Sequence, residues 1–181
     1  NAGDYENLLF GDNETGSMRE YYHEISYGNF SVDGDAGGWY NSSSTMQQAV
    51  DNTREYVSNV ASLADGDFDY GLYDNDGPDN IPNSGDDDGY VDGINIVHAG
   101  QGAEEGDGSN IWSHKWNLGP YARYYDGVLI DSYAINPEKQ DAGYNGFPGL
   151  THIGVICHEF GHALGLPDLY DTDNSSSGIG T

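Results

Sequence analysis

The residues with the clearest chemical capacity form the run HEFGH at positions 158–162, an HExxH sequence. In an α-helix, residues four apart lie about 40° apart around the axis, so His158 and His162 project from one face and can bind one ion. Glu159 is offset from them by about 100° and 60°, which lets it reach a water on the metal rather than the metal itself. Two neutral imidazoles, one anionic ligand and a water suit zinc in a tetrahedral site with one open position.

The reaction expected from such a site is hydrolysis of a peptide bond. Zinc lowers the pKa of a bound water to about 7, and a carboxylate beside that water can accept its proton. Glu159 is therefore the predicted general base, which takes a proton from water and passes it to the leaving amine.

The third zinc ligand is expected to be an aspartate, because no further His, Glu or Cys follows His162. The candidates are Asp168, Asp171 and Asp173. Gly165 allows a sharp turn after the second histidine, and Asp168 follows three residues later, which gives the spacing HExxHxxGxxD. This spacing matches the metzincin pattern with Asp in place of the final His, and it favours Asp168.

A helix must carry these residues, and the segment 151–166 has the pattern of one. Apolar residues recur through it, and Thr151 is a candidate N-cap. Pro167 predicts that the helix ends at about Leu166, since proline cannot continue it.

Helices and strands are predicted to interleave along the rest of the chain. Ser17 and Glu20 have the spacing of a capping box and predict a short helix, and apolar periodicity predicts a long helix over 45–63. Strands are predicted over 29–40, 90–99, 111–116 and 127–135. The expected fold class is α+β, close to α/β: a twisted mixed sheet packed on a backing helix and an active-site helix.

An acidic segment, residues 65–92, contains ten Asp separated mostly by Gly, Pro and Asn. Carboxylates on alternate positions of a flexible loop suit calcium, which accepts six to eight oxygen ligands. The alternative is a solvated acidic loop without an ion. The predicted calcium ligands are Asp74, Asp76, Asp79, Asp86, Asp88 and Asp92, with Asn83 as an additional candidate.

The composition limits the classes of partner. The chain has 181 residues, enough for one ordinary domain, and 31 Asp and Glu against 5 Lys and Arg give a formal net charge of −26. This charge argues against binding to nucleic acid or to an anionic membrane, because both need a basic surface. No apolar stretch approaches the roughly 18 residues of a membrane span. Residue 1 is Asn, so we expect a processed or excised piece.

The run HEFGHALGLPDLYD resembles the active-site segment of the immune inhibitor A type of secreted bacterial metallopeptidases, a metzincin-like group. The similarity extends over nearly the whole chain, through SMREYYHEISYG, DNDGPDNIPNSGDDDGYVDGINIVHAG and IWSHKW. The resemblance implies an exported zinc endopeptidase made with a propeptide and acting on protein or peptide substrates. It also implies that His158, His162 and Asp168 bind zinc and that Glu159 is the general base.

One feature departs from the metzincin pattern. Metzincins have a Met-containing turn downstream of the third ligand, but the methionines here, Met18 and Met46, lie far upstream. We therefore expect residues 1–181 to hold the N-terminal subdomain and the active-site helix of a zinc metallopeptidase catalytic domain, without the C-terminal subdomain. Either a further polypeptide completes the active site, or the fragment is inactive.

A function of another class also fits these residues: a non-catalytic, calcium-stabilised binding or adhesion module in which HExxH is incidental. Zinc content separates this alternative from the peptidase. Trp112 and Trp116 are predicted either to line a strand at the rim of the cleft, where an extended substrate adds as a further strand, or to pack in the core.

Overall fold

The computed structural model of the protein describes residues 1–14, 16–140, 149–170 and 175. The helices within them are α1 (Ala2–Phe10), α2 (Met18–Ile25), α3 (Met46–Asp51), α4 (Thr53–Ala64) and α6 (Ile153–Ala163), with 3-10 turns η1 (Tyr70–Tyr73), η2 (Ala103–Glu105) and η3 (Gly119–Tyr121). The strands are β1 (Asn95–Gln101), β2 (His114–Asn117), β3 (Arg123–Tyr125), β4 (Val128–Ile130), β5 (Ser132–Gln140) and β6 (Gly149–Leu150).

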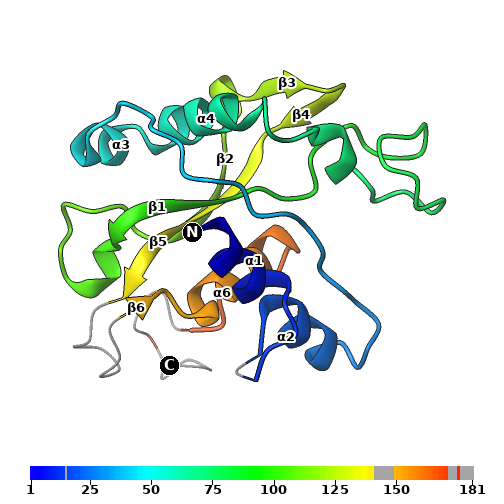
Figure 1. Cartoon of the computed structure of the whole chain (residues 1–181), viewed down its shortest axis with the longest axis horizontal. Helices are drawn as coiled ribbons and strands as arrows, with labels where there is room; N and C mark the ends of the chain where they lie inside the picture. The colour runs from blue at the N-terminus through cyan, green and yellow to red at the C-terminus, as the bar shows by residue number, and fades with distance from the viewer. Residues whose placement is uncertain (15, 141–148, 171–174, 176–181) are drawn as a thin grey trace.

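A mixed sheet lies at the centre of the molecule, with helices on both sides (Figure 1). Its order among the described residues is β1-β5-β2, in which β1 runs parallel and β2 antiparallel to β5, while β6 pairs with the far end of β5. In Figure 1, α3 and α4 lie on one side of the sheet, and α1, α2 and α6 lie on the other. The predicted α+β fold with a mixed sheet is confirmed.

Two apolar cores hold these layers together. In α4, Val57, Ala61 and Ala64 recur every three or four residues, so one face of the helix is buried. That face packs against the strands in a core that includes Ile135 of β5. A second core joins α1, α2 and α6 and contains Ile156. The helix that carries HExxH therefore packs with α1 and α2, on the opposite side of the sheet from α4.

Residues 45–63 form two helices rather than the single helix predicted. The helix is interrupted at Asn52, whose backbone adopts φ −146° and ψ 73°. Its side chain accepts a hydrogen bond from the backbone N–H of Glu55 and thereby caps α4. Apolar periodicity misses this break because Ala49 of α3 and Val57 of α4 belong to the same core.

The strand predicted over residues 29–40 is wrong, because this segment has no regular structure. Side chains bind its backbone instead: Ala36 N–H donates to the Glu6 carboxylate at 2.6 Å, and Arg19 Nε donates to the Val32 carbonyl at 3.2 Å. A Cβ at Gly34 would come within 2.8 Å of the Phe10 ring. Close contact with α1 and α2 therefore replaces the pairing that a strand needs.

The strand predicted over 127–135 is divided between two sheets. β4 pairs with β3, whereas β5 belongs to the central sheet. Asp131 lies between them, where its carboxylate accepts hydrogen bonds from Asn117 Nδ2 at 2.9 Å and from the Gly119 N–H at 2.7 Å. The strands predicted over 90–99 and 111–116 exist but begin later, at Asn95 and His114.

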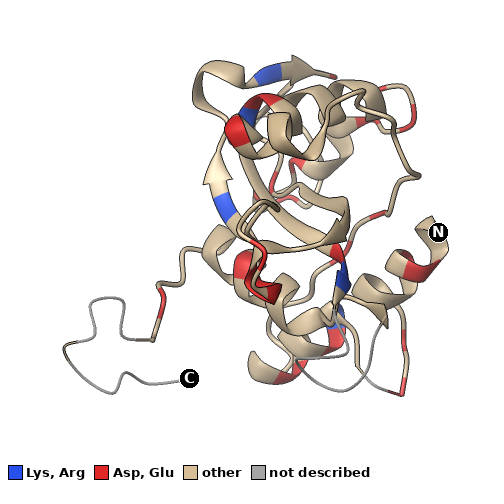
Figure 2. Cartoon of the chain, turned by 90° about the vertical axis from the view of Figure 1, so that its left-hand side faces the viewer, with Lys and Arg blue, Asp and Glu red and all other residues tan. Residues whose placement is uncertain are grey.

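Acidic residues are spread over the helices and loops, whereas basic residues are few (Figure 2). Arg19 of α2 forms an ion pair with Asp33. Among the residues that the structure describes, no helix is long and apolar enough to cross a membrane.

Candidate metal centre

The HExxH run lies in α6, as predicted, but both helix ends differ from the prediction. The N-cap is His152, one residue after the predicted cap, and Thr151 is buried at 2% exposure. The helix ends at Ala163, before the predicted end at Leu166.

A left-handed turn follows α6 and changes the direction of the chain. Gly165 has φ +83°, which glycine adopts without the steric cost that a Cβ would bring. The Leu166 N–H donates to the Gly161 carbonyl at 3.0 Å, and the Gly165 N–H donates to the His162 carbonyl at 3.0 Å. These bonds satisfy the last carbonyls of the helix, and the turn returns the following residues towards the histidines.

Helix α2 fixes the position of α6. The Tyr22 hydroxyl donates to the Cys157 carbonyl at 2.6 Å, in buried surroundings. The Tyr22 ring also meets the Phe160 ring edge-on, with centroids 5.3 Å apart. A Cβ at Gly161 would lie 3.3 Å from the Tyr22 hydroxyl, so the small residue in the HExxH run allows this approach.

Replacing Tyr22 by phenylalanine is expected to lower the free energy of unfolding by about 1 kcal/mol, because the buried Cys157 carbonyl loses its donor. Urea denaturation followed by circular dichroism measures this change. Tyr21→Phe is the matched control, since Tyr21 lies on the same helix and is 43% exposed. Equal losses in the two variants would show that the Tyr22 hydroxyl does not anchor α6.

Three predicted ligands converge at the end of α6. The Nε2 atoms of His158 and His162 are 3.2 Å apart, and Asp168 Oδ1 lies 3.2 Å from each of them. The other two candidates for the third position, Asp171 and Asp173, lie outside the described residues.

This triangle fits zinc. Ligand atoms at about 2.0 Å from a tetrahedral ion lie about 3.3 Å from one another, close to the three 3.2 Å separations here. Two imidazoles with one carboxylate favour zinc over calcium or magnesium, which prefer oxygen ligands. Asp168 Oδ1 is buried and has no hydrogen-bond donor of its own, so it is available to a cation.

A backbone carbonyl orients one of the two rings. His162 Nδ1 lies 2.7 Å from the Leu166 carbonyl oxygen, which can only accept a hydrogen bond. The proton of a neutral His162 ring is therefore held on Nδ1, which leaves the Nε2 lone pair free for a metal. The turn at Gly165 therefore both ends the helix and places the carbonyl that orients His162.

Glu159 lies beside the triangle and is 6% exposed. Its carboxylate accepts a hydrogen bond from the backbone N–H of Lys115 in β2. Burial raises the pKa of Glu159 above its ordinary value, while the neighbouring histidines and the Lys115 hydrogen bond act in the opposite direction. A carboxylate with a raised pKa is a stronger base, as a general base requires.

Comparison with known proteins gives the family. The immune inhibitor A peptidase M6 catalytic domain family matches residues 1–181. The chain belongs to this family. Pre-pro-metalloprotease PrtV of Vibrio cholerae serotype O1 is 34% identical over 209 residues, which cover 96% of this chain and 22% of the relative. Immune inhibitor A of Bacillus thuringiensis subsp. alesti is 31% identical over 211 residues, which cover 98% of this chain and 30% of the relative.

The resemblance drawn from the HExxHxxGxxD run to the immune inhibitor A group is thus confirmed. The chain spans less than a third of the length of these curated relatives.

A second acidic group in this member of the M6 family involves Asp74, Asp76 and Asp87, which each offer a carboxylate oxygen within 4.8 Å of the others. Asp74 is fully buried, and its Oδ1 has no hydrogen-bond donor. Burial raises the pKa of Asp74, and the charges of Asp87 and Asp88 add to this effect. The group therefore carries an electrostatic cost that a cation would offset.

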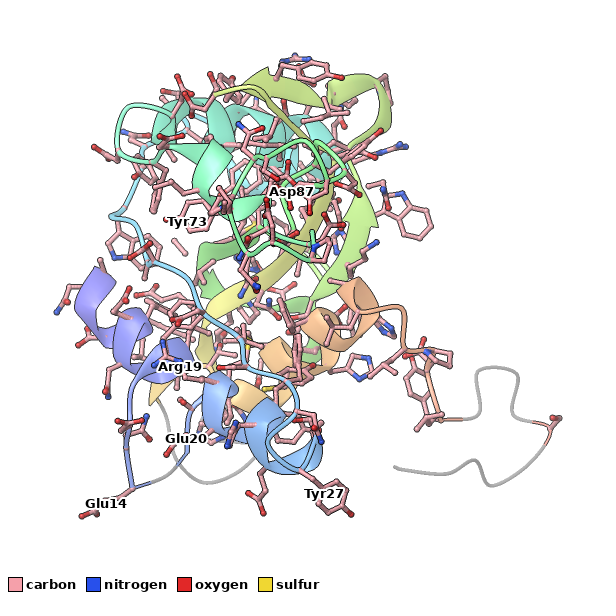
Figure 3. The ribbon with its side chains drawn as sticks, turned by 90° about the vertical axis from the view of Figure 1, so that its right-hand side faces the viewer. Glu14, Arg19, Glu20, Tyr27, Tyr73 and Asp87 are labelled. Atoms are coloured by element: carbon pink, nitrogen blue, oxygen red, sulfur yellow. The ribbon has the colours of Figure 1, made fainter. Side chains whose placement is uncertain are left out.

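Asp87 is brought to Asp74 by a loop that folds back on itself (Figure 3 labels Asp87). Asn83 N–H donates to the Asp74 carbonyl at 2.7 Å, and Gly77 N–H donates to Asp87 Oδ1 at 2.7 Å. A Cβ at Gly77 would lie 2.6 Å from that same oxygen, so a larger residue there would displace the Asp87 carboxylate.

The other predicted calcium ligands bind backbone or hydroxyl groups. Asp79 accepts from the Ile81 N–H at 2.8 Å, and Asp86 accepts from the Ser84 hydroxyl. The side chain of Asp88 accepts from the Tyr90 N–H at 2.9 Å, and that of Asp92 accepts from the Asn75 N–H at 3.2 Å. Asn83 donates its amide to the Asp126 carbonyl at 3.1 Å.

Three groups at these sites were not predicted from the sequence. Asp87 lies between two predicted ligands, but an alternating pattern passes over it. The Lys115 N–H belongs to the backbone and has no side-chain signature. Tyr170 stacks on His158, and only its position two residues after Asp168 hints at this.

Cys157 is buried, as its apolar surroundings suggest, and burial raises the pKa of its thiol to about 12.

Proposed function

We propose that the chain is the zinc-binding part of the catalytic domain of an exported endopeptidase, in which His158, His162 and Asp168 hold the ion. The observation that carries this proposal is the convergence of their two Nε2 atoms and one Oδ1 atom at 3.2 Å. When bound there, zinc supplies a Lewis acid that polarises a carbonyl and lowers the pKa of a water.

The chain's own contribution to hydrolysis centres on Glu159. Its carboxylate accepts a proton from the attacking water and later delivers that proton to the nitrogen of the leaving amine. Burial strengthens the carboxylate as a base, and the Lys115 N–H holds it in place at the edge of β2. The Leu166 carbonyl holds the proton of the neutral His162 ring on Nδ1, so that Nε2 is free to bind the ion.

The outer edge of β2 is the proposed binding surface for an extended peptide. Lys115 is paired with Ala134, whose N–H donates to the Ile94 carbonyl on the β1 side. The backbone groups of Lys115 therefore point away from β5, because such pairs alternate along an antiparallel ladder. Its N–H meets Glu159, and its carbonyl faces outward, where a substrate N–H can donate. Trp116 on this strand is 60% exposed, which agrees with a position at a rim rather than in a core.

His158→Ala is expected to reduce the zinc content from about one ion per chain to a small fraction, since it removes one of three protein ligands. Hydrolysis of casein should disappear with the metal. Metal analysis after dialysis against zinc measures the first effect. His23→Ala, which changes an exposed histidine of α2, is the control and should leave both unchanged. A wild-type chain that retained calcium and no zinc would favour the non-catalytic binding module instead.

We also propose that Asp74, Asp76 and Asp87 form a calcium site. Calcium binds oxygens at about 2.3–2.6 Å, so ligands on opposite sides of the ion lie up to about 5 Å apart, which accommodates the 4.8 Å limit of this group. The buried, unpaired Oδ1 of Asp74 is the second observation that supports an ion. A cation would also reduce the repulsion in a chain of net charge −26.

Export to the extracellular space is proposed from the relatives. The Vibrio proteins are named pre-pro-metalloproteases, and the sequence resembles a secreted group. Protein or peptide substrates follow from the peptidase class of the family.

A further inference from the structure

An open pocket lies beside β2, on the side of the sheet where α3 and α4 lie (Figure 1). Its volume is about 330 Å³, and its walls come from the junction of α3 and α4 and from two strands. We call it the Arg54 pocket, after Arg54 of α4, which lines it together with His114 and Trp116 of β2 and Tyr133 of β5. It contains none of the candidate zinc ligands.

The strand side of the Arg54 pocket is fixed by hydrogen bonds. Trp116 lies directly opposite Tyr133 in the antiparallel pair of β2 and β5. His114 Nδ1 lies 2.8 Å from the Trp112 carbonyl, and His114 Nε2 lies 3.0 Å from the Tyr133 hydroxyl. Because the carbonyl can only accept, a neutral His114 donates from Nδ1 and accepts the Tyr133 hydroxyl proton at Nε2. His114 is therefore a neutral wall of the pocket.

The other side carries the positive charge of Arg54. The chain has 31 Asp and Glu against 5 Lys and Arg, yet Arg54 forms no ion pair and donates no hydrogen bond within the described residues. An unpaired guanidinium in so acidic a chain is a candidate binding group. Each of the other four basic side chains contacts an oxygen acceptor: Arg19, Lys115, Arg123 and Lys139.

Acidic side chains around the Arg54 pocket bind other donors. Asp51 lies three residues before Arg54, but its Oδ1 accepts from Gln47 Nε2 at 2.8 Å. Both oxygens of Asp131 also accept hydrogen bonds. The guanidinium reaches the end of β2, since a Cβ at Gly119 would lie 3.4 Å from Arg54 Nη1. The charge of Arg54 is therefore available beside this strand.

An extended peptide on the outer edge of β2 would place side chains over this pocket. The backbone groups of Lys115 point away from β5, so a peptide residue can pair opposite Lys115 and share its face of the sheet. The two neighbouring peptide residues then point to the other face, beside His114 and Trp116. This is the face opposite α6, so the pocket would act on a substrate side chain without contacting the metal centre.

We propose that Arg54 and Trp116 form a subsite for an acidic substrate side chain, Asp or Glu, next to the residue that pairs with Lys115. This inference rests on the proposed binding of an extended peptide along β2. A guanidinium matches a carboxylate through up to two parallel hydrogen bonds. The Trp116 ring, 60% exposed, offers an apolar wall to the methylene groups of that side chain.

A glutamate scan of a neutral peptide tests the subsite without requiring cleavage. Labelled octapeptides of Thr and Gln, with one Glu at each position in turn, are bound to the zinc-loaded Glu159→Gln chain and followed by fluorescence anisotropy at low salt. Glu at one position, or at two positions separated by one residue, is expected to tighten binding about 3- to 10-fold over the neutral peptide. Elsewhere Glu should weaken binding, because the net charge of −26 repels it. High salt should reduce the gain.

Variants of Arg54 assign the gain to this residue. Arg54→Gln should abolish it, and Arg54→Glu should transfer it to a peptide with Lys at the same position. Arg123→Gln is the matched control and should keep the gain, since Arg123 is an exposed arginine of β3. Arg54→Gln should unfold at the same temperature as the parent chain, because Arg54 is exposed and unpaired, and this shows that a lost gain is not a lost fold.

The possible results separate the two proposals. A gain that survives Arg54→Gln, or the absence of a gain at every Glu position, would overturn the subsite. A chain that binds no peptide, the neutral one included, would overturn the substrate edge of β2 and the subsite with it. Zinc content, measured on the same sample, reports separately on the metal centre.

Discussion

Replacing Glu159 by glutamine is expected to lower kcat/KM for peptide hydrolysis by a factor of about 10² to 10⁴ while zinc remains bound. Glutamine has the same shape, and its carbonyl oxygen can still accept the hydrogen bond from Lys115. The contact between α6 and β2 is therefore preserved. The amide cannot accept a proton from water at neutral pH, so only the proton-transfer step is lost.

Two measurements on the same zinc-loaded sample are needed: zinc content and the hydrolysis of a quenched fluorescent peptide. Glu24→Gln is a suitable control, because Glu24 is an exposed carboxylate of α2 and is not among the candidate ligands. Activity within tenfold of the wild type in Glu159→Gln would show that another group accepts the proton. Loss of zinc in that variant would instead assign Glu159 to the support of the ligands.

The three candidate zinc ligands are predictable from sequence because two of them lie on one helix. The spacing of His158 and His162 becomes a fixed geometry as soon as α6 forms. Asp168 is reached through one turn at Gly165, a residue type that marks such turns. The group that contacts Glu159 is not predictable in this way, since the Lys115 N–H comes from a strand more than 40 residues away and carries no side-chain signal.

The fold was predictable as a class but not element by element. Periodicity identifies which residues are buried, and it is therefore blind to a break such as Asn52, where two helices share one core. The same limit applies at Asp131, where two strands in different sheets share a continuous apolar run. In the segment 29–40, alternation suggested a strand, but side chains of α1 and α2 bind its backbone instead.

The acidic loop shows most clearly which contacts a sequence pattern does not predict. Alternating aspartates correctly mark where negative charge accumulates, but which carboxylates meet depends on how the loop closes. The bond from Asn83 N–H to the Asp74 carbonyl and the bond from Gly77 N–H to Asp87 set that closure. They bring together Asp74 and Asp87, thirteen positions apart, and leave Asp79 on a local turn.

Removing calcium with EGTA is expected to lower the unfolding midpoint by about 5–10 °C. A ligand present at 100 times its dissociation constant stabilises the folded state by about 2.7 kcal/mol, and about 2–4 °C corresponds to 1 kcal/mol in a chain of this length. Differential scanning calorimetry in EGTA and in millimolar calcium measures the shift. Equal midpoints in the two conditions would show that the segment is a solvated acidic loop.

Asp74→Asn distinguishes a bound ion from a solvated acidic loop, because its effect on stability should change sign when calcium is added. Asparagine keeps the shape and can still accept the Gly89 N–H bond that Asp74 Oδ2 receives at 3.2 Å. With EGTA, the variant should match or exceed the stability of the wild type, since a buried charge beside Asp87 and Asp88 is gone. With calcium, it should be less stable than the wild type and show no calcium-dependent shift. Asp79→Asn, on the same loop, is the control and should retain the full calcium-dependent shift of the unfolding midpoint. Loss of this shift in Asp79→Asn and its retention in Asp74→Asn would show that a different set of carboxylates binds the ion.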